Sequence, residues 1–88
     1  MFVGKVTGSI VSTRKNDKLI GSKVMIVESV MHGKKETLVA VDNVGAGIGE
    51  IVLVATGSAA RIGCKLSDAP VDAAIVGIVD SGVGLSGV

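Results

Sequence analysis

Three glycines at alternate positions, Gly45, Gly47 and Gly49, form the motif of this chain that most invites a chemical interpretation. Glycine-rich loops that bind phosphate run from a strand into a helix, whose N-terminus supplies free N–H groups and the positive end of a dipole. Here the loop leads into residues 50–55, which are apolar and β-branched and have no helical period. The spacing is GxGxG and not GxGxxG. The pattern therefore favours a tight backbone corner over a nucleotide site.

Other groups that could do chemistry are sparse. Metal sites need clustered ligands and a catalytic nucleophile needs a nearby base, but the single histidine and cysteine, His32 and Cys64, fall in separate segments. Asp42 and Glu50 flank the glycine loop and could approach each other as an acid/base pair. Carboxylates in such positions more commonly cap loop N–H groups or pair with Lys or Arg. We expect no enzymatic activity, no metal and no cofactor.

The composition is that of one small β-sheet protein. Sixteen valines and eight isoleucines stand among 88 residues, and β-branched side chains pack well on pleated surfaces. Phe2 is the only aromatic residue, so the core must be built from small aliphatic side chains. The apolar content of 48% is more than a monomer of this size easily hides, which predicts an oligomer.

The charge balance and the lack of targeting motifs restrict the classes of partner that we expect. Nine basic and eight acidic residues leave a net charge of +1, and stacking platforms for bases are missing, so we expect no nucleic-acid binding. The chain has no charged-then-apolar leader and no apolar run close to the ~20 residues that a membrane span needs. A lone cysteine fits a reducing compartment. These features predict a soluble, cytoplasmic protein that does not enter membranes.

The elements that position these residues are five short strands and one short helix. The helix is expected over residues 57–63, after the fourth strand. This order predicts an all-β fold, a small five-stranded OB-like barrel, with a single barrel domain over residues 1–80 and a Gly/Ser-rich C-terminal tail over 81–88. The strands are expected at residues 2–13, 23–31, 37–42, 50–55 and 73–80.

The first strand alternates regularly in sequence. Phe2, Val6 and Ile10 are expected on the core face, with Gly4 and Gly8 between them. Glycines on a core face allow the sharp coiling that a small barrel needs.

Arg61 is the one large polar residue of the short helix. It lies near the C-terminal end of the helix, where a cation is favourable. Its guanidinium group could bond the last free carbonyls of the helix, or pair with a carboxylate in the same subunit or across a subunit joint. Asp42, Glu50 and Asp72 are the candidate carboxylates.

Three segments, in this order, resemble the bacterial microcompartment vertex family, the pentameric shell proteins of carboxysomes and of ethanolamine- and propanediol-utilising compartments. The second segment is the most specific of the three. The segments are VTG at residues 6–8 with the residues up to 27, then VGAG at 44–47 with GE at 49–50 and AR at 60–61, and finally Asp72 with IVGIVD at 75–80.

The resemblance implies a homopentameric, non-enzymatic shell protein that caps the vertices of a polyhedral compartment beside hexameric shell proteins. It makes a set of residues candidates for assembly: Gly45, Ala46, Gly47, Gly49, Glu50 and Arg61. The alternative functions are a small OB-like nucleic-acid-binding module, a nucleotide binder at the glycine loop, and an iron–sulfur ligand at Cys64 repeated around a ring.

Overall fold

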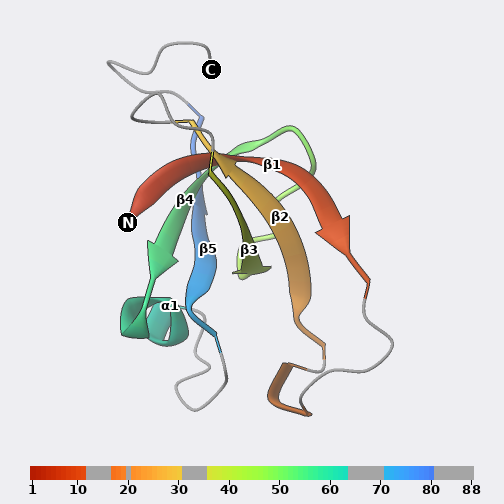
Figure 1. Ribbon diagram of the computed structural model, residues 1–88, viewed down its shortest axis with the longest axis vertical. Helices are drawn as coiled ribbons and strands as arrows, with labels where there is room; N and C mark the ends of the chain where they lie inside the picture. The colour runs from red at the N-terminus through yellow and green to blue at the C-terminus, as the bar shows by residue number, and fades with distance from the viewer. Residues whose placement is uncertain (12–16, 20, 31–35, 64–70, 81–88) are drawn as a thin grey trace.

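The computed structural model describes residues 1–11, 17–19, 21–30, 36–63 and 71–80. Their strands close into a barrel in the order β1-β2-β3-β5-β4, with one short α-helix after β4 (Figure 1). The expected all-β, five-stranded barrel with its single helix is confirmed. The elements are β1 (Phe2–Ile10), the 3₁₀ turn η1 (Asp17–Leu19), β2 (Lys23–Ser29), β3 (Thr37–Asp42), β4 (Ile51–Thr56), α1 (Ser58–Gly63) and β5 (Ala73–Ile78).

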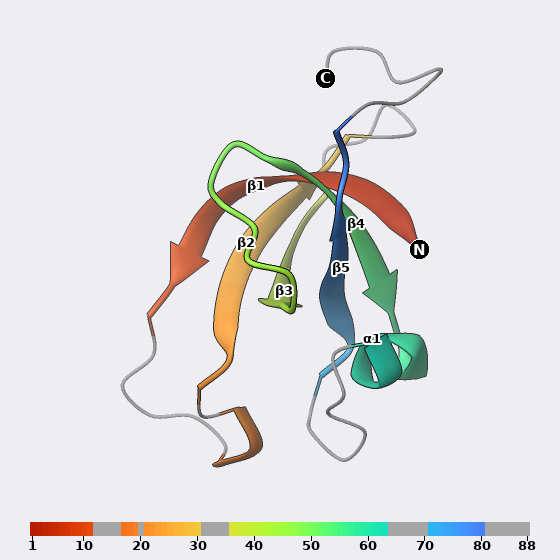
Figure 2. The ribbon, with the colours of Figure 1, turned by 180° about the vertical axis from the view of Figure 1, so that it is seen from behind.

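β3 and β4 are consecutive along the chain but are not neighbours in the barrel. β5 lies between them, parallel to β3 and antiparallel to β4. The connecting segment of residues 43–50, which we call the glycine loop, therefore has to cross the barrel to reach β4. It passes behind the strands in Figure 1 and in front of them in Figure 2.

The barrel interior is filled by small aliphatic side chains, as the shortage of aromatic residues predicts. Phe2 is only partly buried, and it packs against this core together with Leu38. A second, smaller cluster lies between the outer side of β3 and β5 and the helix α1, and it contains Val41, Ala60, Val71 and Ala74. The core of the barrel consists of Val6, Met25, Val27, Ala40, Ala46, Val52, Val54, Ala73 and Ile75.

The sequence predicts correctly which side chains of β1 face the core at the start of the strand, but the prediction is wrong at its end. Val6 is fully buried, as expected. The register of β1 on β2 then shifts between Val6 and Gly8, which places Gly8 opposite Ile26 and Ile10 opposite Val24. A β-bulge adds one residue to the strand, so every later side chain changes sides. Ile10 therefore lies on the outer face and is 38% exposed.

Some sequence features fall outside the described residues. They include His32, Cys64 and the tail 81–88. Among the residues that are described, no helix is long and apolar enough to cross a membrane.

Candidate assembly surface

Two of the three alternating glycines hold a backbone conformation that L-residues rarely adopt. Gly45 has φ +81° and Gly49 has φ +94°, which confirms that this loop needs glycine for its backbone. Gly47 does not have positive φ, and a Cβ there would lie 3.3 Å from Oε1 of Glu50. The requirement for glycine is therefore strict at two positions and milder at the third.

The two carboxylates that flank the loop cap its N–H groups. Oδ1 of Asp42 accepts hydrogen bonds from the backbone N–H groups of Val44 (3.0 Å) and Gly45 (3.1 Å). Oε1 of Glu50 accepts one from the N–H of Gly47 at 2.6 Å. Asp42 and Glu50 thus take the structural role that the sequence favours, and each is occupied with its own end of the loop.

These hydrogen bonds leave few backbone N–H groups of the loop to bind an anion. The N–H of Gly49 donates to the carbonyl of Val6 at 2.8 Å, and the N–H of Glu50 donates to the carbonyl of Gly47 at 3.1 Å. A phosphate-binding loop must offer its free N–H groups to the ligand. Because this loop directs its N–H groups to its own chain and leads into a strand, its geometry is that of a backbone corner.

Two further contacts anchor the loop to the barrel, and neither was expected from the sequence. Ala46 is fully buried in the barrel core, so the middle of the loop is pinned inside. Nζ of Lys23, at the start of β2, donates to the carbonyl of Ala46 at 3.2 Å. The two residues are far apart in sequence, and no spacing rule relates a strand lysine to a loop carbonyl.

The anchored loop presents apolar side chains to solvent. Ile48 is 67% exposed, and Val44 is 38% exposed. Because both ends and the middle of the loop are fixed, these side chains are held outward on a rigid support. An ordered apolar projection of this kind is typical of a surface that contacts another protein.

Arg61 connects α1 to the segment before β5. Its Nη1 donates to the backbone carbonyl of Val71 at 3.1 Å. The carbonyl of Gly63, at the end of the helix, accepts instead from Nδ2 of Asn43 at 2.8 Å. The glycine loop, α1 and the segment before β5 are therefore joined by side chains. Asn43 is a contributor that the sequence analysis missed.

Replacing Gly49 with valine is expected to lower the free energy of unfolding by about 1–2 kcal/mol, the cost of a left-handed conformation in an L-residue. Urea unfolding of the variant and of the wild type at equal protein concentration measures the difference. The control is Ile48→Val at the neighbouring position, where the chain does not carry a glycine. This substitution should change the free energy of unfolding little. Equal stability of Gly49→Val and wild type would contradict the backbone argument.

Comparison with known protein families agrees with this geometry. The family described as "Ethanolamine utilisation protein EutN/carboxysome" matches residues 1–80. The chain is 46% identical over 84 residues to the bacterial microcompartment shell vertex protein GrpN of Rhodospirillum rubrum, covering 92% of this chain and 94% of the relative. It is 42% identical over 88 residues to the shell vertex protein PduN of Salmonella typhimurium, covering 92% and 97%.

Solved structures share the fold across almost the whole chain. CcmL from Nostoc sp. superposes with a TM-score of 0.87 at 43% identity, covering 97% of this chain and 95% of that one. The GrpN pentameric microcompartment shell protein from Rhodospirillum rubrum superposes with a TM-score of 0.83 at 46% identity, covering 94% and 98%. The resemblance seen in the sequence motifs is thereby confirmed. This chain belongs to the EutN/CcmL family of microcompartment shell vertex proteins.

Proposed function

We propose that this chain is a structural shell protein, five copies of which form a ring that caps a vertex of a polyhedral bacterial microcompartment. The observation that carries the proposal is the match to GrpN, a pentameric shell protein with 46% identity over 94% of this chain. The named relatives are shell vertex proteins and not enzymes. The carboxylates and N–H groups of the glycine loop stabilise the fold, which fits a protein that builds architecture.

The geometry of a closed shell explains why such a protein is needed. A layer tiled by six-fold rings is flat, and removing one of six sectors at a point forces curvature. A five-fold tile of similar edge then fills that point. A ring of this kind is built from one repeated, heterologous contact, in which two different surfaces of the subunit meet.

We propose that the partners are further copies of this chain and hexameric shell proteins, with no nucleic acid bound. The place of action is the microcompartment shell inside the bacterial cytoplasm. The barrel domain of residues 1–80, which is the span of the family match, builds the ring, and residues 81–88 form a tail beyond it.

The glycine loop and Arg61 supply one of the two assembly surfaces in this proposal. Support comes from the rigid anchoring of the loop and from the apolar side chains that it exposes. Arg61 contributes through its bond to Val71, which ties α1 to the segment before β5. The candidate residues are Gly45, Ala46, Gly47, Gly49, Glu50 and Arg61.

Native mass spectrometry of the purified wild-type protein tests the proposal. We expect a five-subunit mass, about five times 8.8 kDa, without any added ligand. The same preparation should bind oligonucleotides no more at low salt than at high salt, since a nucleic-acid site would weaken steeply with added salt. A protein that stays monomeric, dimeric or hexameric would refute the pentamer.

A further inference from the structure

The barrel is closed by short pairing between β3 and β5, a junction that we call the seam. The two strands pair at Val41 with Ala74 and at Asp42 with Ile75. Each of the other four junctions between the described strands is paired over at least four residues. Because backbone hydrogen bonds hold neighbouring strands together, the seam is the junction with the least pairing to resist separation.

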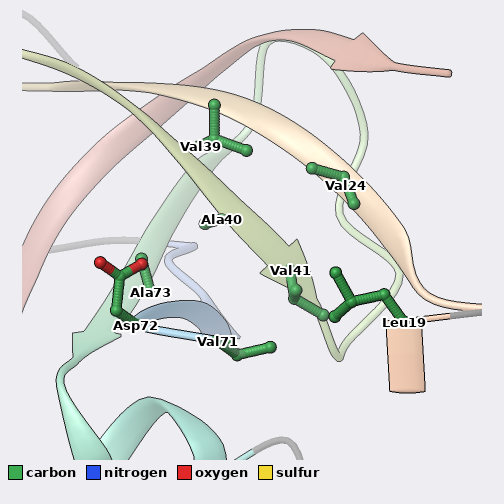
Figure 3. A pocket seen from close by; sticks show the side chains of 8 residues that line it. All are labelled: Leu19, Val24, Val39, Ala40, Val41, Val71, Asp72 and Ala73. Carbon is green, nitrogen blue, oxygen red and sulfur yellow. The ribbon is translucent and has the colours of Figure 1, made fainter. Parts of the chain in front are cut away.

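The packing across the seam is loose as well. A hollow lies between Val39 and Ala40 of β3 and the residues Asp72 and Ala73 at the start of β5, and Figure 3 shows its two sides. A second hollow adjoins it and shares Val39, Asp72 and Ala73 with it. Side chains that face a hollow lose part of the dispersion contacts that they would make in a filled core. Along this part of β3, neither pairing nor dense packing holds the seam closed.

The helix α1 is attached to the β5 side of the seam. In both views it lies beside the start of β5 (Figures 1 and 2). The N–H of Gly57, which leads into the helix, donates to the carbonyl of Asp72 at 2.8 Å. Nη1 of Arg61 donates to the carbonyl of Val71 at 3.1 Å. These two bonds hold α1 against the residues that directly precede β5.

The same helix also reaches the β3 side of the seam. Asn43 directly follows the last residue of β3, and its Nδ2 donates to the carbonyl of Gly63 at 2.8 Å. Ala60 of the helix is fully buried in one apolar cluster with Val41 of β3 and Ala74 of β5. Because Val41 and Ala74 form one of the two residue pairs of the seam, α1 covers the seam where its strands are paired.

We infer that α1 and Asn43 form a strap across the seam, and that the barrel opens locally at the seam when the strap is released. In the closed state, the strap supplies the connection that longer pairing provides at the other junctions. In the open state, β3 and β5 each present an unpaired edge, and such edges pair readily with other chains. The strap acts within one subunit, so the inference goes beyond the proposed pentamer and does not depend on it.

Hydrogen exchange of the intact protein, followed by mass spectrometry, tests the inference. Asn43→Ala removes the bond to the carbonyl of Gly63. Peptides that cover residues 57–63 and 71–78 should exchange about fivefold faster than in the wild type, the effect of one lost hydrogen bond. Peptides from β1 and β2 should stay within about twofold of the wild type, because local opening leaves the rest of the barrel closed.

Thr7→Ala is the matched control. It removes a side-chain hydrogen bond of 3.4 Å to the carbonyl of Ile26, which joins β1 to β2. That junction is paired over six residues, so the lost bond should open nothing. Exchange at the seam should equal that of the wild type.

Gly63→Ala tests the strap from its β5 side. A Cβ at Gly63 would lie 2.8 Å from Cγ1 of Val76 in β5, so the end of the helix must move away from the strand. Overpacking at this contact should speed exchange at the seam by at least about fivefold. The peptides from β1 and β2 should again change little.

Wild type and variants are compared at a concentration where their native masses agree. Selective acceleration of residues 57–63 and 71–78 in both variants would support the strap. Equal acceleration in every peptide would show that these residues stabilise the barrel as a whole, and it would overturn the inference. Unchanged exchange at the seam in either variant would overturn it too. A wild-type mass other than that of five subunits would refute the proposed function, and the exchange result would still decide the strap.

Discussion

Gly4→Ala should destabilise the fold more than any other single-methyl addition in β1, lowering the free energy of unfolding by about 3 kcal/mol. A Cβ at Gly4 would collide with Cγ1 of Val27 and would lie 3.1 Å from the backbone carbonyl of Glu28. Neither neighbour can move away easily. Val27 is fully buried in the core, and Glu28 is paired with β3 through the backbone of β2.

Thermal unfolding at fixed protein concentration measures this effect. For a domain of this size, a loss of about 3 kcal/mol corresponds to a fall in Tm of roughly 12 °C or more. Gly8→Ala is the matched control. A Cβ at Gly8 would meet only the side chain of Ile26 on the outer face, and its nearest atom would be the flexible end, Cδ1, at 3.4 Å. Equal melting temperatures for the two variants would show that Gly4 is not required for close approach.

Arg61→Glu is expected to abolish the ring while the barrel still folds. The guanidinium group of Arg61 donates to the carbonyl of Val71, and Val71 lines a hollow together with Val24 and Val39. A glutamate in its place brings a second acceptor to that carbonyl and reverses the charge beside the proposed assembly surface. The rings should dissociate to monomers at concentrations where the wild type remains pentameric.

The conservative variant Arg61→Lys separates the effect of the positive charge on ring stability from that of the guanidinium geometry. Lysine keeps the positive charge but lacks the planar fork of arginine, so we expect a weakened ring that dissociates at intermediate dilution. Native mass spectrometry across a dilution series gives the oligomer mass, and circular dichroism checks that the β-structure is kept. A ring of wild-type stability in Arg61→Glu would leave Arg61 with only its role inside the subunit.

Much of the fold was predictable because local signals agree with it. β-branched runs mark the five strands, and the short alanine-rich segment before Gly63 marks α1. The ends were less certain: β2 stops at Ser29 and β5 at Ile78, earlier than expected. Strand ends depend on where pairing stops, and pairing is a property of the neighbouring strands.

The functional elements were predictable only in part. The alternate spacing between two apolar runs predicts that at least one of Gly45, Gly47 and Gly49 needs a backbone that only glycine adopts easily. The structure confirms this prediction at Gly45 and Gly49. The support of the loop by Lys23 does not follow from the sequence, because a contact across the barrel depends on the register of strands that are distant along the chain. The proposed role of Arg61 in assembly stays a prediction.

The sequence by itself determined that this is a small β-barrel with a glycine-rich corner and more apolar residues than a monomer of this size easily hides. Its motifs contain no catalytic cluster, and they identified the family. These are properties of residue type and of spacing along the chain. Only the tertiary structure decided which side chains face outward. One extra residue at the bulge after Val6 turns Ile10 away from the core, and β5 inserts between β3 and β4. Both outcomes depend on contacts between distant strands, which no pattern of residue types along the chain encodes.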